Sequence, residues 1–383
     1  MKQFEEVFLE ILKAGMWGVR PQVPEEFDDW GSVVRLAKSQ SVLGIVGDVL
    51  LSDAELSQRI PIELKDKVKK FVMANMVTHS LLNNTLVKVV SALRDNGVES
   101  VLLKGQGIAR NYPRPELRQC GDIDLYVGIG KEEVVHDILA PIAMKIDGKD
   151  CLYINKHFHV TMAGGVEVEV HRYTDNHLTE KLETIYQDAS DKGVTENLVV
   201  YDFLGTPVNT PADNFNAFYI FNHLFHHFIT SGIGLRQFCD WMIFLHKHKG
   251  DIKLDYLEQL LNDMNLMMPW KAFGCVLVKM LGMPQGDFPF YDSHQERKAK
   301  RIIKRVLKEG NFGKERAMIK NRGSVYMANK IRSLFSHIFK AFSLLFLFPK
   351  QIIVQFGSTM AMGFSIVWTD VKDKFKGSSR VEV

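Results

Sequence analysis

The hydrophobic pattern of this chain changes its period twice, and this change limits the folds that the chain can adopt. Before residue 96 and after residue 212, apolar residues recur every three or four positions, which is typical of amphipathic helices. Between these limits, residues 166–171 alternate strictly between apolar and polar, which is typical of a strand. The sequence therefore predicts an α+β fold, with a small mixed β-sheet between an N-terminal and a C-terminal helical region.

Turn and helix-ending signals divide the chain further. Residues 64–94 contain no Pro or Gly, and Asn96-Gly97 after them is suited to the left-handed end of a helix. Two Thr-Pro pairs, at 206–207 and 210–211, punctuate the end of the strand-rich part. We expect four segments, which are an N-terminal helical region (1–95), an α+β core (96–205), a helical domain (206–296) and a basic, then apolar, helical segment (297–383).

Within the expected core, three further patterns predict its elements. Short apolar or alternating runs at 98–103 and 122–127 predict strands, and 131–144 predicts a helix interrupted near Pro141. Two alternating runs on either side of Ala163-Gly164-Gly165 predict a hairpin.

The cysteines indicate the compartment. All four lie far apart without a C-x-x-C pair, so they fit neither a disulfide framework nor a thiolate zinc site, and they suit a reducing compartment. Residues 1–19 carry three glutamates within their apolar stretch, which predicts an amphipathic helix and not a secretory signal. We therefore expect a cytoplasmic protein.

The strongest chemical signal is a pair of acids on one predicted strand. Asp122 and Asp124 lie two positions apart, so both carboxylates point to one face while Ile123 and Leu125 point to the other. Two carboxylates this close repel each other, and a divalent cation such as Mg²⁺ would neutralise them. The alternative is a pair of solvated acids at an exposed strand end.

A second strand carries another polar face, formed by Glu167, Glu169 and His171. A third carboxylate opposite the first two would complete a two-metal site for phosphoryl transfer. The alternative is the polar face of a half-exposed hairpin.

Upstream of both strands, residues 102–107 end a strand in a glycine-rich turn, whose backbone N–H groups can bind phosphate oxygens. A Rossmann fingerprint is excluded, because Arg110 occupies the third glycine position and two prolines follow. Lys104 and Arg118 are candidates for phosphate contact. Their alternative role is an ion pair that neutralises the acids when no metal is bound.

A later helical segment contains His223 and His227, which are four residues apart, as two zinc-binding histidines can be. The Glu of an H-E-x-x-H motif is absent, so zinc is disfavoured. Arg236 and Asp240 have the same spacing, and we expect all four residues to support a helix–helix contact or to lie at the mouth of a cleft.

Together these motifs resemble the polymerase-β-like nucleotidyltransferase superfamily, and more closely its uncharacterised bacterial branch. The superfamily signature is a glycine turn, a D-x-[DE] strand and a third carboxylate on a neighbouring strand, which residues 103–105, 121–124 and 168–171 match. Lys104-Gly105 stands where the superfamily commonly has Gly-Ser. The resemblance covers roughly residues 30–280, and its further matching positions are Tyr112, Arg118, Asn222, His223, Arg236 and Asp240.

The resemblance implies a nucleotidyltransferase core in which Asp122, Asp124 and Glu169 are the catalytic and metal-binding residues. The first two would bridge two Mg²⁺ ions, for which Mn²⁺ can substitute, and Glu169 would hold the acceptor-side ion. The residues expected to bind the nucleotide are Lys104, Gly105, Arg118 and Gly121.

The implied reaction moves a nucleoside monophosphate from a nucleoside triphosphate to an acceptor and releases pyrophosphate. The alternative is a nucleotide-binding or scaffold protein of the same fold that has lost turnover. The sequence identifies neither the acceptor nor the base, and it contains no recognisable nucleic-acid-binding signature.

The end of the chain is strongly basic. Residues 297–340 hold fourteen Lys or Arg against two Glu, a net charge of +12, whereas the first 296 residues carry −11. Apolar runs at 334–348 and 352–368 are too short to span a membrane. We favour packing of this segment on the acidic body, because exposed Phe and Ile side chains promote aggregation. A weak membrane-surface contact through 297–368 is the alternative.

Overall fold

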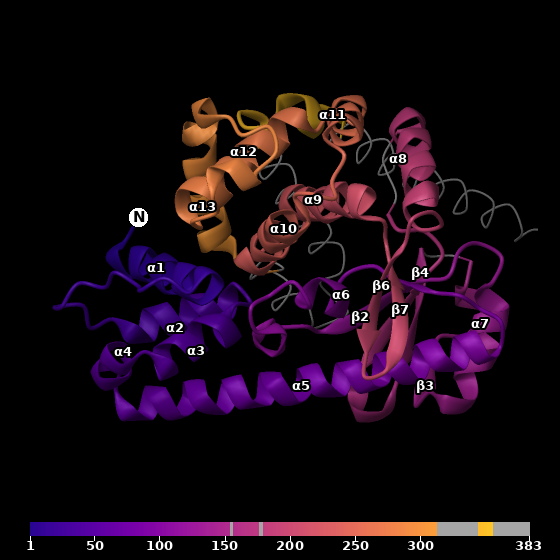
Figure 1. Ribbon diagram of the computed structural model, residues 1–383, viewed down its shortest axis with the longest axis horizontal. Helices are drawn as coiled ribbons and strands as arrows, with labels where there is room; N and C mark the ends of the chain where they lie inside the picture. Colours follow the sequence, from indigo (N-terminus) through magenta and orange to yellow (C-terminus); the bar gives the residue numbers. More distant parts are fainter. Residues whose placement is uncertain (154–155, 176–178, 312–343, 355–383) are drawn as a thin grey trace, which may run out of the picture.

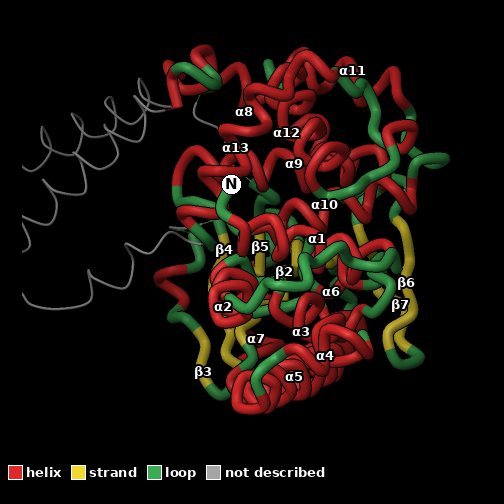
Figure 2. Tube along the Cα trace, turned by 90° about the vertical axis from the view of Figure 1, so that its left-hand side faces the viewer, coloured by secondary structure: helices red, strands yellow, loops and turns green. Residues whose placement is uncertain are grey.

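The computed structural model describes residues 1–153, 156–175, 179–311 and 344–354 of the chain. These residues form a mixed sheet flanked by helices, which confirms the predicted α+β architecture (Figure 1). The sheet lies between one long helix on one side and a group of helices on the other (Figures 1 and 2).

The N-terminal part is helical, as predicted. Its last helix ends where Asn96-Gly97 predicts, because Gly97 has a φ of +76° and the Val98 N–H bonds to the carbonyl of Leu93. Asp29 and Asp53 cap two shorter helices by accepting hydrogen bonds from backbone N–H groups. The helices are α1 (Gln3–Trp17), α2 (Trp30–Ser39), α3 (Leu43–Ser52), α4 (Ala54–Arg59) and α5 (Ile62–Asp95).

The described strands form one seven-stranded sheet in the order β3-β4-β5-β2-β1-β7-β6. β2 runs parallel to β5 and β1 runs parallel to β7, whereas the other neighbours are antiparallel. The predicted hairpin is formed by β4 and β5. The strands are β1 (Val101–Leu102), β2 (Asp122–Tyr126), β3 (Lys145–Ile146), β4 (His157–Thr161), β5 (Glu167–His171), β6 (Val199–Phe203) and β7 (Thr206–Thr210).

Three helices connect these strands: α6 (Gln106–Ala109), α7 (Glu132–Leu139) and α8 (Glu180–Gly193). α7 ends in a 3-10 turn that contains Pro141, so the predicted interruption is confirmed.

α5 joins the two hydrophobic cores of the protein. Its C-terminal half buries Leu86 and Val89 against the apolar face of the sheet, together with Ile123 of β2. Its N-terminal half places Val68 and Val72 in a larger core that the N-terminal and C-terminal helices share. One continuous helix therefore connects the sheet to the helical part of the molecule (Figure 1).

The sheet extends further along the chain than the sequence predicts. The expected end at residue 205 is instead a hairpin turn, because Leu204 and Gly205 both have positive φ, which suits a tight two-residue turn. β7 then follows, and Pro207 lies in it opposite Asp202 of β6. The first Thr-Pro pair therefore lies inside the sheet, whereas the second marks its end, because β7 ends at Thr210. The turn itself was not predictable from the sequence, because leucine at positive φ is not a turn signal.

The second helical part packs on the opposite side of the sheet from α5 (Figures 1 and 2). Its centre is aromatic, with Phe221, Trp241, Trp270 and Phe273 in mutual ring contact. The helices are α9 (Asp213–Thr230), α10 (Leu235–His248), α11 (Leu254–Asp263), α12 (Met267–Met280) and α13 (Glu296–Glu309).

The described end of the chain packs on this helical part. α13 buries Ile302 and Val306, and Phe348 is buried with its ring 5.3 Å from that of Phe225. The favoured intramolecular packing is therefore found for these residues, whereas the rest of the apolar runs, in 312–343 and 355–383, lies outside the described residues. In the part of the chain that the structure describes, each helix is too short or too polar to cross a membrane.

Candidate active site

Two neighbouring strands place their polar faces side by side. In the parallel pairing of β2 with β5, Asp122 is opposite Glu167 and Asp124 is opposite Glu169. Side chains in register on neighbouring strands point the same way, about 4.8 Å apart. The alternate residues are buried in the core: Ile123, Leu125, Val168 and Val170. The expected juxtaposition of a third carboxylate with the D-x-D pair is therefore confirmed, and we call Asp122, Asp124 and Glu169 the carboxylate site.

β4 adds two histidines that the sequence analysis did not select. His157 is opposite His171 and His159 is opposite Glu169, so both rings share the polar face of the sheet. The Nε2 atom of His157 lies 3.6 Å from a carboxylate oxygen of Glu169. The H-x-H pattern of residues 157–159 is visible in the sequence, but only the register of the hairpin shows that both histidines lie beside Glu169 and His171.

Lys104 supplies the main positive charge at the site. Its Nζ lies 3.1 Å from Oδ1 of Asp124, a carboxylate that is only 4% exposed. Gly105, the next residue, suits the close approach of this turn to β2, because its φ is +55° and a Cβ there would lie 3.2 Å from the carbonyl oxygen of Asp122. The ion pair with the acids that the sequence analysis gives as the alternative role of Lys104 is therefore present in the structure, in the contact with Asp124.

His171 links two of the acids. It is 1% exposed, and its Nε2 lies 3.0 Å from Oδ1 of Asp124 and 3.4 Å from Oε2 of Glu169. Its position two residues after Glu169 on one strand face produces this contact.

The ionisation of the three carboxylates differs. Burial and then the charge of Asp124 raise the pKa of Asp122. Burial opposes ionisation of Asp124 as well, but Lys104 and the His171 hydrogen bond outweigh it and hold the pKa of Asp124 well below its usual range. Burial is also outweighed at Glu169, where the hydrogen bond from His171 lowers the pKa. A bound cation would relieve the repulsion felt by Asp122, so these residues fit a divalent metal ion.

Helix α9 lies on the side of the sheet opposite α5, and its His223 is close to the carboxylate site (Figure 1). Burial, followed by the charge of Lys104, lowers the pKa of His223 well below its usual range. Nearby, Lys156 lies 3.6 Å from Asp175, and Asn222 on α9 donates to the same carboxylate. His223 is predicted from the sequence, whereas Lys156 and Asp175 are not, because neither belongs to a recognisable motif.

Arg118 does not contact the carboxylate site and pairs with Asp240 on α10. Its Nε and Nη2 donate to the two carboxylate oxygens of Asp240 at 2.6 and 2.8 Å, and the Tyr112 hydroxyl donates to Oδ1 at 2.7 Å. Arg118 is 5% exposed, so the structure brings it to α10 and not to the carboxylate site. Gly121, by contrast, lies directly before Asp122 at the exposed start of β2.

The spacing of Arg236 and Asp240 on α10 does not produce a contact between them. Arg236 donates instead to the carbonyl of Gln119 at 2.9 Å, while Asp240 accepts from Arg118. Both residues therefore tie α10 to the loop before β2, and these contacts are not the helix–helix contact that the sequence analysis expects.

Among the described residues, two groups have ligand atoms close enough to share a metal ion: His157–Glu169–His171 and Asp213–His248–Asp251. The first adjoins the carboxylate site. His223 and His227 belong to neither group; their rings contact each other edge to face at 4.4 Å.

The burial of His227 leads us to expect that the stability of the protein depends on pH. Burial, followed by the charges of His226 and Lys104, lowers the pKa of His227 to about 4. As the pH falls from about 6.5 to 4, the unfolded chain gains a proton that the folded protein does not, so stability falls. Urea unfolding at pH 7 and at pH 4.5 measures how much unfolding free energy the protein loses between these pH values. We expect His227→Gln to reduce this loss by on the order of 1 kcal/mol, a value that allows for the partial exposure of the ring. His294→Gln, at an exposed position, is the matched control, and an equal loss in both variants would contradict the prediction.

The chain is similar to known proteins of one kind. The sequence model of the family described as "uncharacterised nucleotidyltransferase" matches residues 26–282, a range that contains the whole carboxylate site. A crystal structure of an antigenic nucleotidyltransferase-like protein from Paracoccidioides brasiliensis matches 53% of this chain and 92% of its own, with 12% sequence identity and a TM-score of 0.34. The search of curated proteins found no match.

Proposed function

Because the chain belongs to the uncharacterised nucleotidyltransferase family, we propose that it transfers a nucleoside monophosphate from a nucleoside triphosphate to an acceptor and releases pyrophosphate, with Mg²⁺ as the metal. The observation that carries the proposal is the register that places Glu169 beside Asp124 on adjacent strands. The three carboxylates concentrate negative charge on one face of the sheet. The apolar core behind them keeps the two strands, and therefore the positions of the carboxylates, rigid.

The residues of the carboxylate site have distinct proposed roles. Asp122 and Asp124 would hold both ions, and Glu169 would hold the acceptor-side ion. When bound, the ions would neutralise phosphate charge and polarise the acceptor oxygen. Mn²⁺ is expected to substitute for Mg²⁺, because carboxylate oxygens suit both ions.

Lys104 is the proposed phosphate ligand. It now neutralises Asp124, and a cation at the carboxylate site would take over that neutralisation. Its ammonium group would then be available for a charge-assisted hydrogen bond to the triphosphate. The Gly105 turn would bring backbone N–H groups towards the same phosphates, and Gly121, at the start of β2, would leave room for them. Arg118, which is buried against Asp240, would act by holding the loop before β2 in place.

The acceptor oxygen would attack the α-phosphorus in line, so that one P–O bond forms as the bond to pyrophosphate breaks. No protein nucleophile is required, because the carboxylate site and Lys104 lower the barrier by positioning and charge stabilisation. The presence of all three carboxylates favours an active enzyme over a silent nucleotide-binding scaffold.

The cysteines support the proposal that the protein works in the reducing cytoplasm. Cys120, Cys151, Cys239 and Cys275 are free thiols in the structure, and two of them are buried.

The function is tested by a thermal-shift panel of the four nucleoside triphosphates with and without Mg²⁺, followed by a pyrophosphate-release assay. A triphosphate that binds the folded protein raises its melting temperature, and we expect this rise to depend on Mg²⁺. Glu169→Gln should reduce pyrophosphate release about 1000-fold while triphosphate binding persists, because Glu169 is assigned to the acceptor-side ion.

Glu167→Gln is the matched control for this test. Glu167 lies on the same strand face, but it accepts a hydrogen bond from Thr161 at 2.9 Å, so most activity should persist. Mg²⁺-dependent nucleotide binding by the wild type, with no pyrophosphate release against a broad acceptor panel, would favour the scaffold alternative.

A further inference from the structure

The basic charge of α13 is not neutralised by the acidic body of the protein. Lys300 pairs with Glu296 and Arg305 pairs with Glu309, so both ion pairs lie within the helix itself. Lys304 and Lys308 are exposed and form no ion pair with any residue that the structure describes. Among the described residues, the pairing with the acidic body that the sequence suggests is therefore not found for Lys304 and Lys308, and these two charges can meet another partner.

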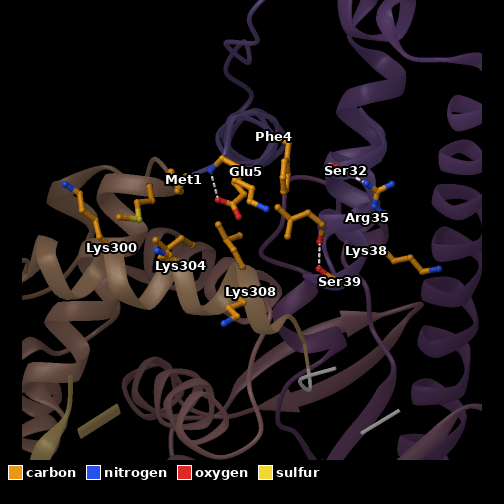
Figure 3. Close-up of a pocket in the computed structure, with 15 residues that line it drawn as sticks. Met1, Phe4, Glu5, Ser32, Arg35, Lys38, Ser39, Lys300, Lys304 and Lys308 are labelled. Atoms are coloured by element: carbon orange, nitrogen blue, oxygen red, sulfur yellow. Dashed lines mark hydrogen bonds between the residues drawn. The ribbon is translucent and has the colours of Figure 1, made fainter. Parts of the chain in front are cut away.

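These lysines stand at the edge of a large cavity. It has a volume of about 1300 Å³ and lies between the N-terminal turn of α1, α2 and α13 (Figure 3). Lys300, Lys304 and Lys308 follow one another along the α13 side, and Arg35 and Lys38 come from α2. Successive lysines four residues apart are about 6 Å from one another on one helix face.

The interior of the cavity is apolar. Its wall is formed by Phe4, Leu36, Met280, Ile303 and Leu307. The acid that lines it is Glu5, which already accepts a hydrogen bond of 2.8 Å from the backbone N–H of Lys2. Apolar walls and a cationic edge with few acids are therefore combined in one concave surface.

We infer that this cavity binds an amphipathic anion, namely a single lipid with an anionic headgroup and an apolar chain. The chain would cover the half-buried Phe4 and Met280 and lie against the buried rest of the wall, and the headgroup would meet Lys304 and Lys308, which lack carboxylate partners among the described residues. A neutral lipid would leave these cations unpaired, and a hydrophilic polyanion would leave the apolar wall open. The following residues 312–343 are poor occupants, because they carry seven Lys or Arg and one Glu, which the basic edge would repel.

This inference does not rest on the proposed transfer reaction. The residues that carry it belong to α1, α2, α12 and α13, whereas the carboxylate site is built on β2 and β5. Loss of lipid binding and loss of nucleotidyl transfer are therefore separate results.

The test uses the full-length protein and lysophosphatidylglycerol below its critical micelle concentration. We expect saturable binding in calorimetric titration and a rise in melting temperature. Lysophosphatidylcholine, which has no net charge, and glycerol 3-phosphate, which has no chain, should each bind about tenfold more weakly or not at all. Vesicles of phosphatidylglycerol and phosphatidylcholine form a further arm, and binding to vesicles without binding to the monomeric lipid would replace the cavity with a membrane-surface contact and overturn the inference.

The charge-reversal variant Lys304→Glu/Lys308→Glu should weaken lysophosphatidylglycerol binding about tenfold or more. Lys67→Glu/Lys70→Glu makes the same charge change on the exposed face of α5 and is the matched control, expected to bind like the wild type. Equal weakening in both double variants would show a general charge effect and would overturn the inference, as would tight binding of lysophosphatidylcholine. All four lysines are exposed, so both double variants are expected to fold.

Discussion

Asp122→Asn and Asp124→Asn are both expected to abolish nucleotidyl transfer, but only Asp124→Asn should destabilise the protein. Each removes a carboxylate proposed to hold both metal ions, so transfer should fall about 1000-fold or more. Asp124→Asn also leaves the Lys104 ammonium buried beside a neutral amide, which should cost about 3 kcal/mol of unfolding free energy. Asp122→Asn removes a carboxylate whose pKa burial and Asp124 already raise, so it should cost no stability.

Pyrophosphate release and urea unfolding of the two variants measure these effects. The variant Asp124→Asn/Lys104→Met is the informative control, because it buries neither charge and should recover most of the lost stability without recovering transfer. If the Asp122→Asn/Asp124→Asn variant still turned over at the wild-type rate, the carboxylate site would not be the active site.

Asp240→Asn is expected to destabilise the protein by about 3–5 kcal/mol, the largest effect on stability that we predict. The Asp240 carboxylate accepts hydrogen bonds from Arg118 on both oxygens and from the Tyr112 hydroxyl on Oδ1, and the substitution replaces one of these oxygens with an amide nitrogen. It therefore leaves the Arg118 guanidinium buried without a counter-charge. These residues join α10 to the loop before β2, so loss of the contact also loosens the start of the strand that carries Asp122.

Equilibrium unfolding in urea measures this effect, and a triphosphate titration of the folded variant measures its consequence for the site. Asp137→Asn is the matched control, because Asp137 forms an exposed ion pair with Lys149 and such pairs contribute little. If Asp240→Asn lowered the unfolding free energy no more than Asp137→Asn does, the buried pair of Arg118 and Asp240 would not hold α10 and the loop before β2 together.

Local sequence patterns suffice to predict the individual helices and strands and the residues that lie on each face of them. A period of two places Asp122 with Asp124, and Glu169 with His171, whatever the rest of the chain does, because successive side chains of a strand alternate between its faces. The end of α5 at Asn96-Gly97 is equally local, since it depends on a backbone conformation that glycine adopts without strain. Such features are set by a few neighbouring residues, and pattern analysis identifies them.

Which of these residues meet, and which acid each cation binds, depends on how the helices and strands pack together. Lys104 and Arg118 are both cations near the acids in sequence, yet Lys104 binds Asp124 while Arg118 binds Asp240, 122 residues away. His157 joins Glu169 through the register of a hairpin, and the free lysines of α13 face a cavity built with helices from the opposite end of the chain. The physical reason is that ion pairs and packed surfaces depend on distances in space, which the docking of α9, α10 and α13 sets and which no local periodicity contains.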